Sequence, residues 1–573
     1  MAAPVSPEPS DRAPGPGVPN RLLRGYGPVA LFAVLMVLVA WLVPSKVQSS
    51  AGASSGGSGA SGGPLPGTTG ANGPASASGQ PGSATAAPGS GGGLPGTSGS
   101  SGSAGHTVTT PANVGQCGGQ TEQIPGDPYS PPCMTFSGSN GGGTSTGVTA
   151  NAVNVSFRVT SDQSFQQTLA QLAGAQLADT NADTERTIQV LAQYFNSHFQ
   201  FYGRKLAFHF YNGQGSLSNE LLGQGQAQAE ADALTAKQMG VFADMSAESE
   251  PYAADLAAQK IMAFGDPYLS RDWHQQHAPY GWSVATDGTD VAQIAADYTV
   301  QKLCPNGKPA SFAGGNLKNA PRKFALLAPE NSWYQVSVDV AQSYGNQHHC
   351  AGTKYTYSLD LGTMSQQAAN LISKLKADGV TTIECGCDPI FPVYLSGQGA
   401  QQGYFPEFVV VGTALTDQDY VGQLYNQQFQ SHAFGISPNG PTVPYTQTIG
   451  YAAYKSIDPK TEPAFFVNLI YAQMDMLAIG IQMAGPQLTP QSFQQGMFHY
   501  PPKEGPMGLW GWDGQQFTVP NDVREICWNP STISAYNNKA GAYVGTSNQR
   551  WTFGSVPGGP PGCPAGFPFS PSS

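Results

Sequence analysis

Short apolar strands alternate with helical segments along this chain, and this alternation constrains the fold more than any other feature. The run NVSFRVT (residues 154–160) predicts a first strand, the apolar spacing over residues 182–202 a helix, and residues 206–211 a second strand. Such units imply right-handed crossovers and parallel sheets that helices cover on both faces. The alternation begins again with FALLAP (residues 324–329). The sequence therefore predicts an α/β fold of two Rossmann-like lobes with parallel sheets.

The remaining elements of lobe one are predicted from the same patterns. They are a helix over residues 221–239, a strand over 241–245, a helix over 253–264 and a strand over 266–269. A long apolar helix is predicted over residues 464–484, and we expect it to pack against lobe one. The alternative, a membrane span, is disfavoured by the polar residues Asn468, Gln473, Asp475 and Gln482 within it.

The chain from Asn113 onward, about 450 residues, exceeds one ordinary core and fits two lobes. We expect residues 113–150 to form a disulfide-bearing lead-in and residues 151–318 with 452–545 to form lobe one. Lobe two is expected over residues 319–451, followed by a Pro/Gly-rich tail over residues 546–573.

One apolar run, PVALFAVLMVLVAWLV, precedes these lobes and has the length of a short membrane span. Arginines at positions 12, 21 and 24 precede it, and only Lys46 follows closely. This asymmetry predicts a cytoplasmic N-terminus (residues 1–27), a transmembrane helix or signal anchor (28–46) and an extracytoplasmic remainder. The protein would then be a single-pass protein of the cell membrane. A cleaved secretory signal ending near Val47 and Ser49 remains the alternative.

A Gly/Ser/Pro/Ala tract over residues 47–112 follows the apolar run. No Asp, Glu, Lys, Arg, Phe, Trp or Tyr occurs between Val47 and Thr121. Such a segment buries too little apolar surface to offset the entropy lost on ordering. It is predicted to be a disordered spacer. The formal net charge of the chain is −11, and no cluster of cations is present to bind phosphate, which argues against a nucleic-acid partner.

Eight cysteines occur, all beyond the spacer, and an even number in an oxidising compartment indicates disulfides. Proximity in the sequence favours Cys117 with Cys133 and Cys304 with Cys350, which leaves Cys527 with Cys563 to fasten the C-terminal tail. Cys385 and Cys387 would form a local bridge, remain thiols or bind a metal. A single CxC lacks the second ligand pair of a zinc site, so no metal and no other cofactor is predicted.

Three segments carry a resemblance to a known family. They are GVTANAVNVSF at the first strand, PYGWSVATDGTDVAQIAADYTVQKL between the lobes, and RKFALLAPENSWYQVSVDVAQSYG at the start of lobe two. Over roughly residues 148–543 the chain resembles the type I periplasmic-binding-protein fold, in particular the branched-chain amino-acid family of solute-binding proteins attached to ABC importers. The resemblance implies that a small-molecule solute binds in an interlobe cleft, that hinge closure retains it, and that ABC permease subunits receive it. No catalysis is implied.

The resemblance also implies where the solute binds, because ligands of such folds lie beyond the carboxyl ends of the strands. In lobe one, Arg271 would pair with a carboxylate or be a solvated loop residue, and in lobe two Tyr334 or Trp333 would cover the ligand or pack between the lobes. The family's acidic ligand residue is not evident at Thr413 and Ala414, so Asp388 or Asp417 would replace it. The solute is accordingly an amino acid, a peptide or a related compound. The predicted ligand-binding residues are Ser246, Glu248, Ser249, Ser270, Arg271, Trp273, Trp333, Tyr334, Asp388 and Thr413.

Two other classes of function are less well supported by the sequence. A membrane-anchored ectodomain that senses a ligand would act through a partner protein, because the segment before Pro28 is too short for an output domain. An envelope enzyme is disfavoured, since the chain has no G-x-S-x-G elbow and no H-E-x-x-H motif. The prediction is a solute-binding protein that is not an enzyme.

Overall fold

The structure is a computed structural model that describes residues 117–160 and 179–571, apart from 266, 305–308 and 351, together with residues 162 and 168. Contacts divide the chain between Ser101 and Gly102, and all described residues belong to the second unit. The predicted cytoplasmic N-terminus, membrane helix and spacer lie outside the described residues. Within the described part, no helix has the length and apolar character needed to cross a membrane.

Lobe one is built on a five-stranded parallel sheet in the order β2-β1-β3-β4-β5. In the pair at one edge of the sheet, Val153 of β1 lies opposite Leu206 of β2. The strands are β1 (Ala152–Val159), β2 (Lys205–Asn212), β3 (Ala243–Asp244), β4 (Met262–Phe264) and β5 (Gly281–Trp282).

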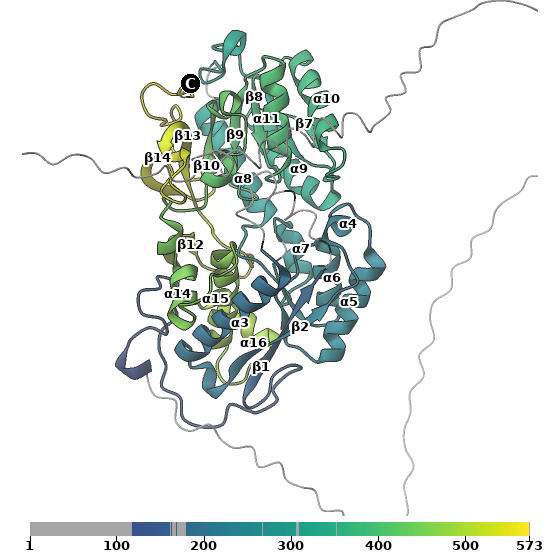
Figure 1. Cartoon of the computed structure of the whole chain (residues 1–573), viewed down its shortest axis with the longest axis vertical. Helices are drawn as coiled ribbons and strands as arrows, with labels where there is room; N and C mark the ends of the chain where they lie inside the picture. The colour runs from purple at the N-terminus through teal and green to yellow at the C-terminus, as the bar shows by residue number, and fades with distance from the viewer. Residues whose placement is uncertain are drawn as a thin grey trace, which may run out of the picture. The chain divides into compact units, whose positions relative to one another are not determined.

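Helices cover both faces of this sheet, as the alternation predicts (Figure 1). On one face, α3, α15 and α16 enclose a large core that includes Phe195, Leu477 and Phe493. On the other face, α5 and α6 enclose a smaller core rich in alanine. The helices of lobe one are α3 (Asn181–His198), α4 (Leu217–Leu221), α5 (Gln226–Met239), α6 (Glu250–Ala258), α7 (Arg271–Gln276), α14 (Ile449–Ile457), α15 (Val467–Met483) and α16 (Pro490–Phe498), with a hairpin of β11 (Lys503–Gly505) and β12 (Gly508–Trp510).

Lobe two has a seven-stranded sheet in the order β14-β13-β10-β9-β8-β6-β7. The strand FALLAP (β6), which lies between β8 and the edge strand β7, is buried along its whole length, as expected for a strand covered on both faces. β13 pairs in antiparallel fashion with both β10 and β14, so β13 alone runs against the other six strands. The strands are β6 (Phe324–Pro329), β7 (Gly352–Tyr357), β8 (Thr382–Cys385), β9 (Glu407–Val410), β10 (Ala433–Ser437), β13 (Val523–Ile533) and β14 (Ala540–Trp551).

The helices of lobe two also form two layers. One core lies under α10 and α11, and the other lies under α8, whose residues Ile294 and Tyr298 pack against Phe434. The helices are α8 (Gly288–Tyr298), continued by one π-helical turn (Thr299–Leu303), α9 (Ser332–Gln347), α10 (Met364–Ala377), α11 (Phe391–Gln401), α12 (Asp419–Gly422) and α13 (Gln427–Gln430); short 3-10 turns occur at Cys117–Gly119, Phe201–Gly203, Gly315–Leu317 and Tyr445–Gln447.

The chain passes between the lobes three times, over residues 283–287, 438–448 and 517–522. Two of these crossings are joined by hydrogen bonds. The backbone N–H of Asp287 donates to Thr518 Oγ1 at 2.9 Å, and Thr286 Oγ1 donates to the carbonyl of Pro520 at 2.7 Å. Narrow connections of this kind form a hinge about which two lobes rotate.

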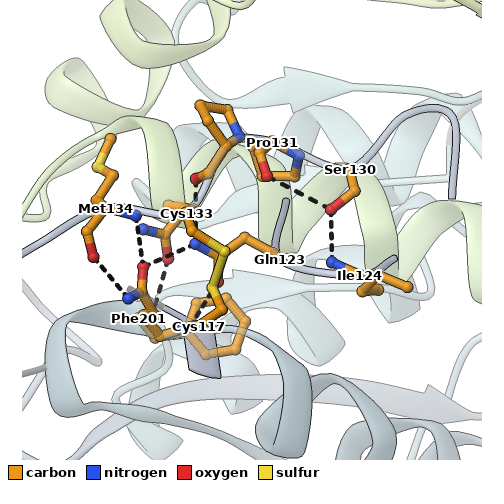
Figure 2. Close-up of a disulfide and its surroundings, with 11 residues drawn as sticks. Cys117, Gln123, Ile124, Ser130, Pro131, Cys133, Met134 and Phe201 are labelled. Carbon is orange, nitrogen blue, oxygen red and sulfur yellow. Dashed lines mark hydrogen bonds between the residues drawn. A yellow bond between two sulfur atoms is a disulfide. The ribbon is translucent and has the colours of Figure 1, made fainter. Parts of the chain in front are cut away.

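The disulfides match the pairs favoured by sequence proximity, and they also pair Cys385 with Cys387. Figure 2 shows the Cys117–Cys133 bridge in the lead-in. Next to it, Gln200 donates to the carbonyl of Met134 at 2.6 Å, and further along the lead-in Tyr129 stacks on Trp510 with ring centroids 4.2 Å apart. The lead-in is therefore part of lobe one.

Three predictions about local structure are wrong. The predicted helix over residues 221–239 is two helices, because Gly223 and Gly225 adopt left-handed conformations between them (φ 72° and 73°). The fourth strand lies at residues 262–264 rather than 266–269, because α6 ends at Ala258 and Lys260 turns the chain with a φ of 67°. Two segments predicted in lobe one belong to lobe two: α8 packs against the lobe-two core, and residues 523–545 join the lobe-two sheet, where β13 pairs with β10. A hairpin without an intervening helix gives no βαβ signal.

Candidate functional site

The loops that follow the strands of the two lobes meet, and their residues form the candidate site. Asn331, which follows β6 and precedes α9, donates through Nδ2 to the carbonyl of Leu221 in α4, at 2.5 Å. The backbone N–H of Ala414, beyond β9, donates to the hydroxyl of Tyr268, beyond β4, at 2.6 Å. These bonds join lobe one to lobe two at the carboxyl ends of their strands. We call this region the interlobe site.

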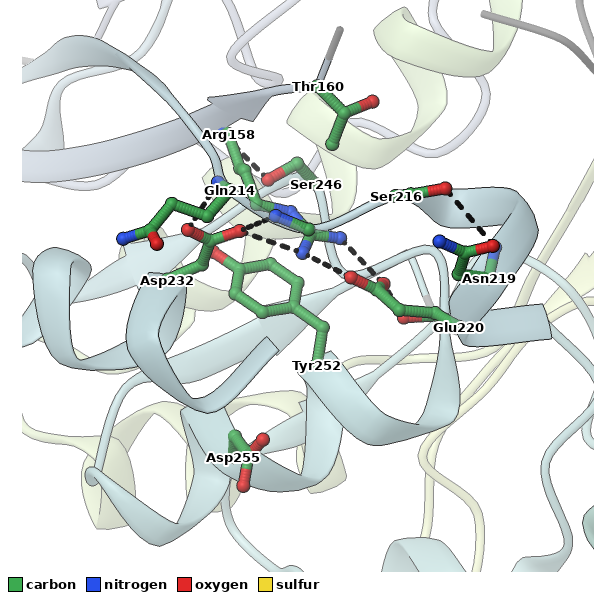
Figure 3. A network of polar contacts seen from close by, with 12 residues as sticks. Arg158, Thr160, Gln214, Ser216, Asn219, Glu220, Asp232, Ser246, Tyr252 and Asp255 are labelled. Atoms are coloured by element: carbon green, nitrogen blue, oxygen red, sulfur yellow. Dashed lines mark hydrogen bonds and ion pairs between the residues drawn. The ribbon is translucent and has the colours of Figure 1, made fainter. Parts of the chain in front are cut away.

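Behind the interlobe site, lobe one contains a buried ionic network centred on Arg158, near the end of β1 (Figure 3). Its guanidinium forms a bidentate pair with Glu220, at 2.8 and 2.9 Å, and a second ion pair with Asp232 at 3.3 Å. It also lies 3.6 Å from the ring centroid of Tyr252. A buried charge of this kind is stable only with such partners.

Two predicted ligand-binding residues belong to this network. Ser246 donates to Asp244 at 2.6 Å and accepts the backbone N–H of Arg158 at 2.8 Å. Ser249 donates through its hydroxyl to Glu220. The structure thus uses both hydroxyls inside lobe one, where they hold the loop after β3 in place.

Glu248, between these two serines, is different. Its side chain is exposed to solvent, yet the surrounding atoms desolvate it enough to raise its pKa above the ordinary value. A cationic or hydrogen-bond-donating group of a ligand would relieve that desolvation.

Tyr268 and its partner loop adopt strained backbone conformations. The φ angles of Tyr268, Ala414 and Leu415 are 61°, 47° and 64°, in the left-handed region that L-residues rarely occupy. Burial raises the pKa of the Tyr268 phenol, with smaller contributions from Asp417 and Tyr334 of lobe two. Strain of this kind is concentrated at ligand clamps and switch regions.

Three buried polar atoms lie at Asn331 and in the first two turns of α9. Asn331 Oδ1, Trp333 Nε1 and Ser337 Oγ are buried and have no hydrogen-bond partner among the described residues. Most buried polar atoms in native proteins are hydrogen-bonded, because an unpaired one costs roughly 1–3 kcal/mol. These atoms make the start of α9 a candidate contact region of the interlobe site.

Other predicted residues lie elsewhere. Ser270 accepts the backbone N–H of Trp273 and so begins α7, and Trp273 donates through Nε1 to Glu250 at 3.1 Å. Arg271 forms an ion pair with Asp290, at the start of α8. The predicted contacts assumed a strand ending at Leu269. Because β4 ends at Phe264, the residue that follows it into the interlobe site is Tyr268.

The predicted polar residues of lobe two are also hydrogen-bonded to other groups of the protein. Asp388 accepts the Tyr357 hydroxyl at 2.7 Å and the backbone N–H groups of Ile390 and Phe391, and burial raises its pKa. Thr413 donates to the carbonyl of Cys387 at 3.4 Å, and Asp417 accepts from Ser437 and Asn439.

Glu248, Trp333 and Tyr334 stay predicted ligand contacts, whereas Tyr268, Asn331 and Ser337 of the interlobe site were not predicted. Asn331 had a signal, because it follows β6 directly. No signal in the sequence pointed to Ser337. The helical repeat of α9 brings this residue to the start of α8, where a Cβ added to Gly288 would lie 2.2 Å from Ser337 Oγ. Among the described residues, no group of His, Cys, Asp and Glu side chains has the arrangement of a metal site.

Comparisons with known proteins bear on the fold. A scan against family models finds no match, and a search of curated proteins finds none either. Among solved structures, an ABC transporter substrate-binding protein from Aeropyrum pernix matches with a TM-score of 0.50 and 11% identity, over 70% of this chain and 96% of that one.

Two further structures match at lower TM-scores. A solute-binding protein from R. palustris in complex with 4-hydroxybenzoate matches at 0.48 and 10% identity, over 70% of this chain and 98% of that one. The branched-chain amino acid transporter substrate binding protein LivJ from Streptococcus pneumoniae, in complex with isoleucine, matches at 0.45 and 14% identity, over 69% of this chain and 100% of that one. The predicted type I periplasmic-binding-protein fold is confirmed.

Proposed function

We propose that this chain, which has the fold of an ABC transporter substrate-binding protein, captures a small polar solute between its lobes and delivers it to an ABC importer. The observation that carries the proposal is the set of unpartnered buried atoms at Asn331, Trp333 and Ser337. They lie where the carboxyl ends of two parallel sheets face each other, which is where open α/β folds bind ligands.

Capture of this kind needs only a change in the population of closed molecules. A solute that contacts both lobes interacts more strongly with the closed state than with the open one, and it shifts the equilibrium by that difference. The bonds from Ala414 to Tyr268 and from Asn331 to Leu221 are the contacts that such closure makes. No bond of the solute has to break.

The chemistry of the site limits the solute. Trp333 supplies an N–H donor, Asn331 an acceptor, and Glu248 a desolvated carboxyl group. A molecule with an amine or hydroxyl group and an acceptor would satisfy all three, as an amino acid or a short peptide does. Under this proposal the lobes lie outside the cell membrane, and the N-terminal apolar run anchors them there.

The proposal is tested by thermal unfolding of the purified protein with a panel of amino acids, short peptides, sugars and aromatic acids. A ligand bound only to the folded state at about one hundred times its Kd stabilises that state by about 2.7 kcal/mol. We expect one solute class to raise the midpoint of unfolding. A flat response to the whole panel would contradict solute capture.

Trp333→Phe should weaken the solute identified in this way about five-fold, because the substitution removes one N–H donor, worth about 1 kcal/mol, and keeps an aromatic ring. Trp273→Phe is the matched control, since the Trp273 indole donates to Glu250 within lobe one. Its affinity should equal that of the native protein. Isothermal titration calorimetry measures both. If both variants lost the same affinity for the solute, Trp333 would not be a contact of the solute.

A further inference from the structure

A cavity of about 520 Å³ lies at the hinge, and all three crossings between the lobes line it. Thr286 belongs to the first crossing, Pro438 to the second and Pro520 to the third. Arg271 of lobe one and Phe553, which follows β14, lie in the same wall. Cavities of this size hold small organic molecules. A molecule in this cavity would contact every segment about which the lobes rotate.

The charged side chains of the lining do not balance. Four line the cavity, and three of them are acidic. Arg271 pairs with Asp290. Asp522 pairs with Arg550, which lies outside the lining, at 2.6 and 2.8 Å. The remaining acid is Asp513, which pairs with no cation among the described residues. The cavity therefore has one uncompensated negative charge.

The carboxyl group of Asp513 is exposed to solvent and is held in place by the turn that follows it. Its Oδ1 accepts the backbone N–H groups of Gln515 and Gln516, at 2.8 and 3.0 Å. Its Oδ2 has no hydrogen-bond partner among the described residues. The side chain of Gln516 also donates to Asp290 at 3.0 Å, so this residue joins the unpaired acid to the paired one. A carboxylate that is fixed in position and open to water is available to a cationic ligand.

The wall also has apolar surface that water reaches. The side chain of Phe553 is 43% exposed, and Val291 and Leu509 are half-buried. Three prolines add to this surface, namely Pro438, Pro502 and Pro520. Covering apolar surface of this kind releases the water that it contacts, which favours a ligand with an apolar body.

We propose that the hinge cavity is a second binding site, which takes an amine that is protonated at neutral pH and carries an aromatic or aliphatic body. The ammonium group lies against the carboxylate of Asp513, and the body covers the apolar part of the wall. An anion is disfavoured, because the uncompensated negative charge repels it.

Ligand-observed NMR titration of the purified protein tests the site, with phenethylamine as the probe. Phenethylamine should bind saturably, with a Kd on the order of 1 mM for a molecule of this size. Phenethyl alcohol has the same shape without the charge, and it should bind about three- to five-fold more weakly, the effect of one exposed ion pair. Phenylacetate carries the opposite charge and should bind about ten-fold more weakly than the amine.

Paired variants assign the ammonium contact. Asp513→Asn should lower the affinity for phenethylamine to that for phenethyl alcohol and leave the alcohol unaffected. Asn keeps an Oδ1 acceptor for the backbone N–H groups of Gln515 and Gln516, so the turn is preserved. Glu230→Gln is the matched control, because Glu230 is an exposed acid of α5 that does not line the cavity. It removes the same net charge, yet the affinity for phenethylamine should stay within about two-fold.

A third variant separates the hinge cavity from the interlobe site. Glu248 does not line the cavity, so Glu248→Gln should leave phenethylamine binding within about two-fold of the native protein. A loss in Glu248→Gln but not in Asp513→Asn would place the amine between the lobes, which overturns this proposal and leaves solute capture intact. Absence of saturable binding, equal affinity for phenethyl alcohol, or equal losses in the Asp513 and Glu230 variants would each overturn it too.

Discussion

Arg158→Met is expected to lower the free energy of unfolding by about 3–5 kcal/mol, the cost of breaking a buried ionic network by removing one partner. The Arg158 side chain is 2% exposed, and its loss leaves the carboxylates of Glu220 and Asp232 buried without their cation. Met fills a similar volume, so the loss measures charge rather than a cavity. Urea unfolding at neutral pH, followed by circular dichroism, gives the free energy.

Arg186→Met is the matched control on α3 of the same lobe. Arg186 pairs with Asp183, but its side chain is 36% exposed, and exposed pairs contribute at most about 1 kcal/mol. Arg158→Lys keeps the charge without the bidentate geometry and should fall between the two. It also provides the measurement if the Met variant does not fold. Equal destabilisation by Arg158→Met and Arg186→Met would contradict the network's role.

Glu384→Gln is expected to stabilise the protein by about 3 kcal/mol above pH 7 and to change little in acid. Glu384 lies on β8 in the lobe-two core, and burial raises its pKa from 4.5 to about 7. Because the folded chain binds this proton more tightly than the unfolded chain, the stabilisation is fully present below pH 4.5 and is lost as the pH rises through about 7. Gln has a similar shape and no charge, so it avoids this loss.

Urea unfolding at several pH values between about 4 and 8 measures the effect, which follows from the linkage of proton binding to folding. Glu407→Gln is the control on the neighbouring strand. Glu407 is equally buried but pairs with Arg322 at 2.8 Å, so its substitution should destabilise the protein at neutral pH. A Glu384→Gln variant whose advantage does not grow with pH would contradict the raised pKa of this buried carboxyl group.

The fold could be predicted because its signals are local. The run FALLAP is a strand because all six residues are buried between two helical layers, and it is predicted as such. The three residues of β4 could not be separated from the preceding helix, because MAF continues an apolar pattern and only the left-handed Lys260 marks the break. The β13 and β14 hairpin was missed because its long strands contain Asn, Ser and Gly and pair without a crossover helix.

The interlobe site was predicted less well, because its chemistry depends on which side chains already have partners. Ser249 and Asp388 are residue types that often contact ligands. In the structure, however, Ser249 donates its hydrogen bond to Glu220, and Asp388 accepts hydrogen bonds from the backbone at the start of α11. Glu220 lies 29 residues before Ser249, and this separation in the sequence does not predict that the two residues are in contact. Trp333 was predicted because aromatic residues after β6 are a feature of the family it resembles. Its unpartnered N–H became visible only in three dimensions.

The most direct test of solute capture between the lobes is small-angle X-ray scattering of the purified protein, titrated with the solute found by thermal unfolding. The account predicts that the radius of gyration falls as the solute saturates the protein, and that the solute recovered afterwards is chemically unchanged. Binding that leaves the radius of gyration unaltered, or recovery of a converted product, would contradict it.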